Sequence, residues 1–376
     1  MSLPHGTHWG VIGCGVIGER RCLQLPVGVQ ISTCFDINHE RAQRLAEKLG
    51  GTHGTTKVAA TLEEFLATPG LEAVIIAAIN SELVPLAQAC LNKGLHILVE
   101  KPAARSIREL EQLKNPHGRI IKIGFNHRFH PAFERLHEEL AKDPADPIMF
   151  IRAQYGNGAR VGFENEWRAK IELGGGGELL DQGVHVLDLG AVLIPDLDVV
   201  AGYTRTHFWN MPVDDNTWAI LRSPESGATF TFHVSSTEWK NEFRFEVYTR
   251  RCKYQWLGLG RSYGTERLLI HRMKPEMGPP ESEEITFSKD DQSWLLENEN
   301  FLGAIRRHLH VNGGLEDAVR ALSLVEDIYQ SSRRLQHGAK DHPRWYGDHE
   351  TGMGASPFDR TPNETLADET SAEKLN

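Results

Sequence analysis

Lysine, aspartate and histidine occur in this sequence at spacings suited to moving a proton to or from a hydroxyl group. Lys101 lies within Glu100-Lys101-Pro102, where a lysine can bind a hydroxyl or lower the pKa of a neighbouring acid–base group. Asp181 and His185 are four residues apart, which places them on one face of a helix if the segment is helical. An aspartate so placed can orient an imidazole that shuttles a proton.

We take Lys101, Asp181 and His185 as the candidate catalytic residues. His185 is the better proton carrier, because the unperturbed pKa of histidine is near neutrality, but Lys101 as the base stays open. Each residue also has a structural interpretation. Lys101 can be a surface lysine after a strand, and Asp181 and His185 can be an ion pair on a helix surface. Asp188, about one turn further along, is interpreted as a structural partner.

A glycine motif near the N-terminus has the spacing of a dinucleotide-binding turn. Gly13, Gly15 and Gly18 lie between a predicted strand and a predicted helix. The first glycine allows a tight turn, the second lets the backbone approach a pyrophosphate, and the third allows close packing of helix on strand. The helix N-terminus then offers free N–H groups to the phosphates. This motif predicts a dinucleotide site.

Asp36 follows the second predicted strand, eighteen residues beyond Gly18. A carboxylate there can accept hydrogen bonds from a ribose hydroxyl and would repel a 2′-phosphate. It therefore favours NAD over NADP, although the nearby Arg41 keeps NADP possible. The alternative is a turn aspartate that caps the next helix.

Two further segments carry side chains that could contact a substrate. Residues 126–128, ending in Arg128, follow a predicted strand and could line the nicotinamide end of a site, or form a plain loop. Trp167 and Arg168 precede a glycine run at 174–177. An arginine can grip a phosphate through two parallel hydrogen bonds, although an exposed basic turn is the alternative. The glycine run allows close approach of the backbone to a ligand.

The elements that must position these residues fall into two patterns. Up to about residue 125, apolar strands alternate with helices, which predicts a parallel, doubly wound sheet. Strand ends in such sheets face a ligand crevice, and Lys101 follows one of them. The strands are predicted at 8–12, 29–35, 71–78, 96–99 and 120–124, and the helices after Gly15, at 39–49, after a capping box at 61–64, and at 81–93.

The pattern changes after about residue 147. Strands in hairpin succession predict a mostly antiparallel sheet, at 148–155, 199–208, 217–221, 228–234, 243–249 and 252–256. Helices are predicted at 180–193, 294–310 and 315–331. We expect an α/β protein with a dinucleotide-binding Rossmann domain at 1–125 and a substrate and oligomerisation domain at 126–336. The late helices could pack back on the first domain, and a polar tail occupies 337–376.

Composition narrows the functional classes. The 376 residues are enough for two domains, and a net charge of -10 argues against a nucleic-acid-binding surface. No apolar run approaches the length of a membrane span, and we see no signal peptide at the N-terminus. The five cysteines are scattered without a CxxC pair, which fits reduced thiols in a cytoplasm and predicts no metal site.

The order GCGVIG, Asp36, EKP and GGGGELLDQGVHVLDL resembles the Gfo/Idh/MocA oxidoreductases over about residues 7–335. The resemblance implies a Rossmann domain followed by an α/β domain whose open sheet forms a homodimer or homotetramer. It implies NAD(P)-dependent oxidation or reduction of a ring hydroxyl on a sugar, an inositol or a nucleotide sugar. The sequence departs from the family at Leu83, where many members have a histidine. The segment 239–269 is similar to members encoded among surface-polysaccharide genes.

The resemblance also implies a set of site residues. Those expected to bind the cofactor are Gly13, Gly15, Val16, Ile17, Gly18, Asp36, Asn80, Glu100 and Lys101. Those expected to bind the substrate are Lys101, Arg128, Trp167, Arg168, Asp181 and His185. Two alternatives remain: an NAD-dependent glycoside hydrolase that uses transient oxidation, and a non-catalytic dinucleotide sensor. The presence of the three candidate catalytic residues argues against the sensor.

Overall fold

The structure is a computed structural model that describes residues 7–53, 55–287 and 290–338. The N-terminal residues considered for a signal peptide, and the predicted tail from residue 339 on, lie outside the described residues. The chain divides into a unit of residues 1–335 and a short terminal unit, and the fold and site below belong to the first. None of the helices in the described part of the chain has the length and apolarity needed to span a bilayer.

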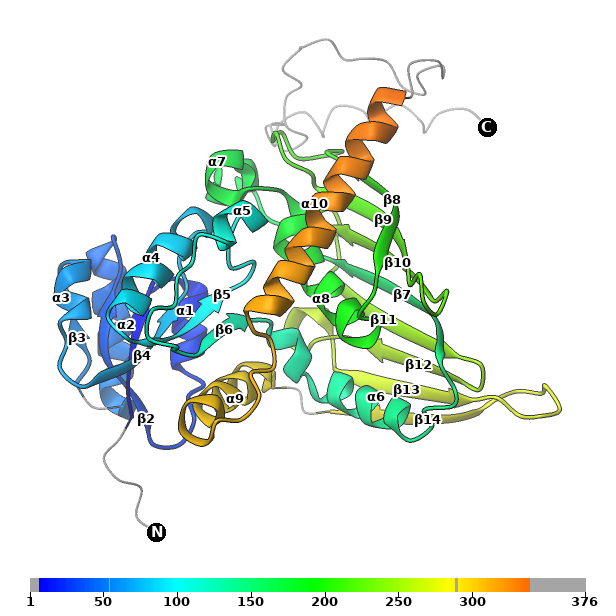
Figure 1. Cartoon of the computed structure of the whole chain (residues 1–376), viewed down its shortest axis with the longest axis horizontal. Helices are drawn as coiled ribbons and strands as arrows, with labels where there is room; N and C mark the ends of the chain where they lie inside the picture. The colour runs from blue at the N-terminus through cyan, green and yellow to red at the C-terminus, as the bar shows by residue number, and fades with distance from the viewer. Residues whose placement is uncertain (1–6, 54, 288–289, 339–376) are drawn as a thin grey trace, which may run out of the picture. The chain divides into compact units, whose positions relative to one another are not determined.

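The first sheet is parallel and has six strands in the order β3-β2-β1-β4-β5-β6 (Figure 1). This is the doubly wound order of a Rossmann domain, as the sequence predicts. The strands are β1 (Thr7–Ile12), β2 (Val29–Phe35), β3 (Lys57–Val58), β4 (Leu71–Ile76), β5 (His96–Glu100) and β6 (Ile121–Gly124). The helices are α1 (Val16–Cys22), α2 (His39–His53), α3 (Leu62–Leu66), α4 (Asn80–Asn92) and α5 (Ile107–Leu110). The two-residue β3 is too short to leave a sequence pattern.

The second sheet has eight strands in the order β14-β13-β12-β11-β7-β10-β9-β8. Only β7 and β10 pair in parallel, so the predicted mostly antiparallel sheet is confirmed. The strands are β7 (Ile148–Gly156), β8 (Asp198–Arg205), β9 (Asn216–Arg222), β10 (Thr229–Ser235), β11 (Glu242–Thr249), β12 (Cys252–Leu257), β13 (Arg267–Arg272) and β14 (Glu281–Thr286). The sequence analysis missed β13 and β14, and β14 is an acidic edge strand without apolar alternation.

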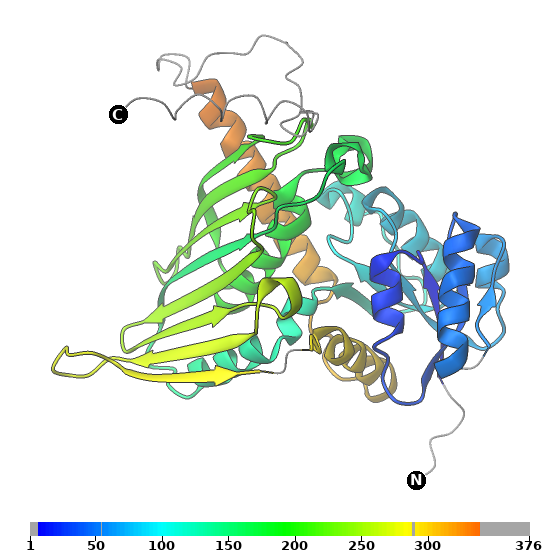
Figure 2. The same cartoon turned by 180° about the vertical axis from the view of Figure 1, so that it is seen from behind.

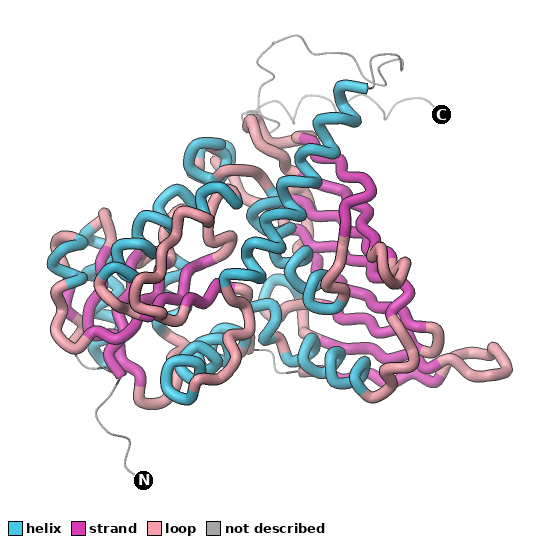
Figure 3. Tube along the Cα trace, in the orientation of Figure 1, coloured by secondary structure: helices cyan, strands magenta, loops and turns pink. Residues whose placement is uncertain are grey.

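Helices cover one face of this second sheet and leave the other face open (Figures 2 and 3). The longer ones are α6 (Pro131–Ala141), α8 (Val184–Leu193) and α10 (Leu315–Gly338). A fourth long helix, α9 (Ser293–Arg307), lies elsewhere. Short helical segments are η1 (Asn126–Phe129), η2 (Phe163–Asn165), η3 (Trp167–Ala169), α7 (Ile171–Gly174), η4 (Leu179–Gly183) and η5 (Arg261–Tyr263).

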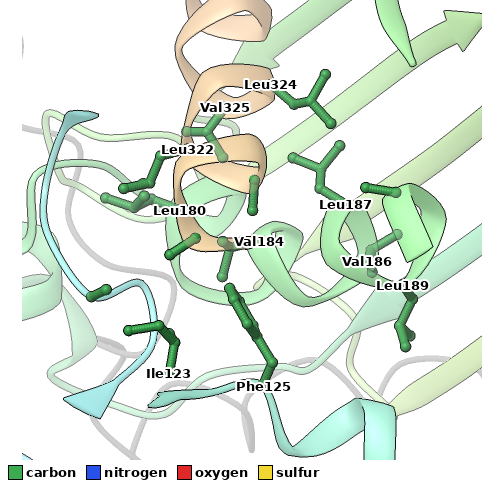
Figure 4. Packing of buried hydrophobic residues seen from close by; sticks show 14 of the residues in the cluster. Ile123, Phe125, Leu180, Val184, Val186, Leu187, Leu189, Leu322, Leu324 and Val325 are labelled. Carbon is green, nitrogen blue, oxygen red and sulfur yellow. The ribbon is translucent and has the colours of Figure 1, made fainter. Parts of the chain in front are cut away.

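A continuous apolar core runs between the two sheets. Phe125, directly after β6, points toward Val184 of α8, and Leu322 of α10 belongs to the same apolar cluster beside Leu180 (Figure 4). The late helix α9 packs instead on the first sheet, where Phe301 lies with its ring centroid 5.1 Å from that of Trp9. The end of β6 and the start of α8 therefore belong to one rigid interior.

The core position of α10 leads to a stability prediction. Leu322 is fully buried whereas Leu335 on the same helix is 49% exposed. Leu322→Ala should lower the free energy of unfolding by about 2–5 kcal/mol, because it leaves a cavity. Leu335→Ala, the same chemical change, should alter it by no more than about 0.5 kcal/mol. Urea unfolding of both variants measures the difference, and equal losses would contradict the assignment of the core.

Candidate functional site

The glycine loop after β1 has the geometry of a dinucleotide turn. Gly13 has φ +89°, and a Cβ there would lie 2.3 Å from the Ala77 carbonyl oxygen. A Cβ at Gly18 would lie 1.9 Å from the Gly13 oxygen. A Cβ at Gly15 would meet nothing within 4 Å, so this glycine alone borders open space, where a pyrophosphate can approach the backbone. The residues present therefore fit a dinucleotide.

The start of α1 adds free donors at the same place. Its first turn contains Val16 and Ile17, two of the predicted cofactor-binding residues, and Val16 is 75% exposed. Gly15 precedes the helix without any side-chain cap. The first N–H groups of a helix lack intrahelical partners, so here they are available to an anion.

Asp36 is tied to the glycine loop. Its Oδ2 accepts a hydrogen bond of 2.8 Å from the Cys14 N–H, and its Oδ1 accepts one of 2.8 Å from the Asn38 N–H. The second contact is a local turn interaction, and the helix-capping alternative is not observed, because the Asn38 Oδ1 accepts the Arg41 N–H at the start of α2. Because a carboxylate has about four acceptor positions, these two contacts leave capacity for a ribose hydroxyl.

Lys101 and Asp181 meet, although they are eighty residues apart in the chain. The Lys101 Nζ donates to the Asp181 Oδ1 at 2.5 Å and to its main-chain oxygen at 2.6 Å. The Arg168 Nε donates to the Asp181 Oδ2 at 3.1 Å, and the Arg168 guanidinium lies over the Trp167 ring, 4.4 Å from its centroid. Four of the predicted substrate-binding residues are thus assembled in one place.

The pKa values of two nearby carboxyl groups, Asp181 and Glu178, are shifted in opposite directions. Burial alone would raise the pKa of Asp181, but Lys101 and Arg168 outweigh burial and hold it well below its usual range. Burial, followed by the neighbouring Asp181 and Asp214, raises the pKa of Glu178 well above the usual value. Its Oε1 is buried and has no hydrogen-bond partner among the described residues. The sequence analysis did not single out Glu178.

The predicted pairing of Asp181 with His185 is wrong. The segment Leu179–Gly183 is a π-helix, and Asp181 lies within it. The Asp181 carboxylate is taken by Lys101 and Arg168 instead. The His185 Nδ1 is buried and has no hydrogen-bond partner in the part of the chain that the structure describes.

His185 stacks on His127 rather than pairing with a carboxylate. The two ring centroids are 4.0 Å apart and the planes are inclined by 23°. Burial, followed by the charges of Lys101 and His130, places the pKa of His185 well below the usual histidine value. The imidazole is therefore neutral at pH 7 and can accept a proton. Among the described residues, no group of three or more His, Cys, Asp or Glu is arranged to hold a metal ion.

Arg128, a predicted substrate-binding residue, is a structural residue instead. It is 5% exposed and donates to both Asp188 carboxylate oxygens, at 2.7 and 2.5 Å. It also donates to Asn312 at 3.0 Å and pairs with Asp317 at 3.0 Å. With every nitrogen of the guanidinium engaged, Arg128 is unavailable to a substrate. Asp188 is the structural partner that we predicted.

Two residues predicted to bind the cofactor make other contacts. The Asn80 Nδ2 donates to the Gly174 oxygen at 2.9 Å, so Asn80 holds the loop before the π-helix. Glu100 is buried and its carboxylate forms an ion pair with Arg21 of α1. We therefore withdraw Glu100 from the cofactor-binding set.

Asp214, which the sequence analysis missed, positions the segment that carries Asp181. Its carboxylate accepts hydrogen bonds from the N–H groups of Gly177 at 3.2 Å and Leu179 at 2.9 Å, and from the Tyr329 hydroxyl at 2.7 Å. A Cβ at Gly177 would lie 2.0 Å from the Asp214 main-chain oxygen. Glycine is required at position 177 because of this contact within the protein interior. The expectation that the glycine run serves the approach of a ligand is wrong at this position.

Two models of known protein families match this chain. The model of an oxidoreductase family with an NAD-binding Rossmann fold matches residues 7–117, and the model of the Gfo/Idh/MocA C-terminal domain matches residues 133–255. The chain belongs to the Gfo/Idh/MocA family. Its N-terminal domain is accordingly an NAD-binding Rossmann domain, as predicted.

Curated relatives of this family member include dehydrogenases. The chain is 26% identical over 188 residues to trans-1,2-dihydrobenzene-1,2-diol dehydrogenase of Xenopus tropicalis. The aligned region covers 48% of this chain and 54% of that protein. It is 30% identical over 158 residues to inositol 2-dehydrogenase of Corynebacterium glutamicum. This region covers 39% of this chain and 45% of that protein. The chain thus spans about half the length of these relatives.

Solved structures share the fold over nearly their whole length. A levoglucosan dehydrogenase in complex with NADH and levoglucosan has a TM-score of 0.79 at 18% identity, covering 88% of this chain and 98% of that one. A 3-ketoreductase from Actinomadura kijaniata in complex with NADP and TDP-benzene has a TM-score of 0.73 at 20% identity, covering 87% and 98%. At these identities the likeness is one of fold.

The contacts of Asp36 lead to a prediction about cofactor choice. Asp36→Asn keeps an acceptor for the Cys14 N–H but removes the negative charge. NADH should bind more weakly and NADPH more tightly, so that the ratio of their Kd values shifts by about tenfold, or roughly 1.4 kcal/mol. Glu40→Gln removes a nearby exposed charge without a loop contact and is the matched control. Fluorescence titration measures both Kd values, and an unchanged ratio would remove Asp36 from the ribose site.

Proposed function

We propose that this protein is an NAD(P)-dependent dehydrogenase or reductase acting on a ring hydroxyl of a sugar, an inositol or a nucleotide sugar. The observation that carries the proposal is the Asp181 carboxylate, which binds both Lys101, at the end of β5, and Arg168, beside a neutral His185. This cluster follows the same edge of the first sheet as the glycine loop. Charged donors and a proton acceptor are thus gathered where a nicotinamide would present its ring.

Bound NAD(P) would supply the hydride acceptor or donor for the carbinol carbon, and the side chains handle the proton and the charge. His185 is neutral, and its Nδ1 has no hydrogen-bond partner among the described residues; it accepts the hydroxyl proton during oxidation. Lys101, held by two oxygens of Asp181, stabilises the developing negative charge on the substrate oxygen. The ionised Asp181 keeps the lysine in place and balances its charge.

A nucleotide sugar used for surface polysaccharides is the narrower proposal. It is supported by the resemblance of segment 239–269, and Tyr263 of that segment lies beside the site. Its ring centroid is 5.5 Å from that of Tyr155. Burial, followed by the charge of Glu178, raises the pKa of Tyr263 to about 12, so its hydroxyl remains a neutral donor for a sugar hydroxyl.

The proposed activity is tested by substrate conversion. Purified protein is supplied with NAD and a panel of sugars, inositols and nucleotide sugars, and NADH absorbance is recorded. Lys101→Met and His185→Ala should each lower kcat by about 10²- to 10⁴-fold, whereas Lys170→Met, an exposed lysine nearby, should not. Glycoside cleavage without net NADH formation would favour the hydrolase instead. Dinucleotide binding without turnover on any compound would favour the sensor.

The pH profile decides which group is the base. If His185 accepts the proton, kcat/KM for oxidation falls only as the pH drops below the usual histidine pKa of about 6.5, because the folded protein holds the pKa of His185 lower. The rate is then flat through pH 7, and His185→Ala removes the acidic limb. A rate that keeps rising well above pH 8 in the wild type would assign the base to Lys101.

We also propose a homodimer or homotetramer that forms through the open face of the second sheet. Phe150, Trp218 and Ile220 are 37%, 39% and 44% exposed there. Trp218 stacks on His233 at 4.4 Å, and Phe150 on Tyr248 at 4.2 Å, so the apolar surface is ordered. Contiguous apolar surface of this kind typifies protein interfaces.

The oligomer proposal is tested by sedimentation. Ile220→Lys puts a charge in the centre of the apolar face and should convert the oligomer to monomers without unfolding them, since burying an unpaired charge is costly. Val161→Lys, at an 81% exposed apolar residue outside the second sheet, is the control and should leave the mass unchanged. A wild-type protein that sediments as a monomer at micromolar concentration would refute the proposal.

A further inference from the structure

A buried ion network lies directly behind Lys101. Arg21 of α1 pairs through its Nε with Glu100, the last residue of β5, and through its Nη1 with the Glu297 Oε2 of α9 at 2.7 Å. The side chains of Arg21 and Glu297 are fully buried, and that of Glu100 is nearly so. One guanidinium therefore joins the helix of the dinucleotide loop, the strand that ends at Lys101, and a late helix.

The surroundings of Arg21 leave its guanidinium little freedom to move. The Trp294 ring lies 4.7 Å from it. A Cβ at Gly124 would lie 2.5 Å from the Arg21 Nη2 and 3.2 Å from the Glu100 carboxylate oxygens, so this position on β6 excludes any larger residue. The Asn298 Nδ2 donates to the Arg21 main-chain oxygen at 3.2 Å. Both the backbone and the head group of Arg21 are thus held.

The network is a costly way to gain stability. Removing three charges from water costs several kcal/mol for each ion, and apolar side chains of the same volume often stabilise a protein equally well. The two carboxylates also exceed the one guanidinium in charge, and Lys122, with its Nζ 3.9 Å from Glu297, balances the excess. The benefit of such a network is directional, because bidentate and charge-assisted hydrogen bonds fix geometry.

The network fixes the direction in which the Lys101 side chain leaves the end of β5. Glu100 and Lys101 are consecutive, so their side chains leave the end of β5 on opposite sides. Glu100 reaches inward to Arg21, while Lys101 reaches the Asp181 Oδ1 at 2.5 Å. A shift of the Glu100 side chain would move the backbone that carries Lys101.

We propose that Arg21 is a positioning residue, which acts through Glu100 to hold Lys101 against Asp181. The helix that presents its N-terminus to the dinucleotide thereby also sets the placement of the lysine. The effect on turnover rests on the proposed function, in which Lys101 acts on the substrate oxygen. The effect on the placement of Lys101 is independent of that function.

The test uses changes at Glu100, since Arg21→Met would leave two buried carboxylates unpaired and is expected to unfold the domain. Glu100→Gln keeps the shape and weakens the contact with Arg21. Glu100→Asp keeps the charge but shortens the side chain. Both should lower kcat about tenfold and leave the Kd for NADH within twofold, because the glycine loop is untouched.

Asn298→Ala is the matched control. Asn298 lies on α9, is fully buried, and its side-chain hydrogen bonds to the described residues go to the main-chain oxygens of Arg21 and Gln24, not to the Arg21 guanidinium or to Glu100. The change should lower Tm and leave kcat unaltered. If the Glu100 variants behave in the same way, the network is merely structural. If Glu100→Asp keeps full kcat while Glu100→Gln loses it, charge rather than position matters, and the proposal is wrong.

A second readout needs no substrate. Reductive methylation with formaldehyde, followed by peptide mass spectrometry, measures the reactivity of each lysine. The Lys101 side chain is 16% exposed, Lys48 is 50% exposed and Lys122 is fully buried. In both Glu100 variants, Lys101 should be methylated several-fold faster, with Lys48 unchanged as the reagent control and Lys122 still protected as the folding control.

The two readouts separate the two proposals. Faster methylation of Lys101 in a protein that turns over no carbohydrate would keep the positioning role and refute the proposed function. If the wild type turns over a carbohydrate, while the Glu100 variants show unchanged Lys101 methylation and unchanged kcat, the proposed function stands and the positioning role is refuted.

Discussion

The ion pair between Lys101 and Asp181 is the contact on which the site depends. It joins the end of a strand in the first sheet to a helical segment that packs under the second sheet. Neither residue is fully exposed or fully buried, so the pair is only partly screened by water and its attraction is larger than that of a surface pair. Around it the protein builds a chain of supports: Arg21 and Glu100 behind the lysine, and Asp214 and Tyr329 behind the aspartate.

The short segment 178–185 shows how environment assigns chemical roles. Lys101 and Arg168 hold the pKa of Asp181 well below its usual range, whereas burial and neighbouring carboxylates raise the pKa of Glu178, three residues earlier. His185 is neutral because it is buried beside Lys101 and other histidines. Groups whose pKa values are pushed apart in this way are the usual basis for separate acid, base and electrostatic roles.

The sequence predicts the parts of this protein that rest on local rules. The glycine loop and the two sheets follow from residue spacing and from where strands end, whereas the contact of Lys101 with Asp181 does not follow from spacing. The rest depends on partners distant in the chain. Arg128 and Glu100 carry charges that suit a ligand, yet each is used internally, because Asp188 and Arg21 reach them from other elements. The strand β14 is missed because an edge strand needs no apolar face.

The geometry of His185 was missed for a different reason. A π-helix differs from an α-helix by one residue in one turn, and the sequence LLDQG gives no local signal of it. This one helix carries Asp181, which binds Lys101 at the end of β5, and His185, which stacks on His127. Neighbouring turns of a single helix therefore hold the charge-balancing group and the proton acceptor, so a small rotation of this helix would displace both at once.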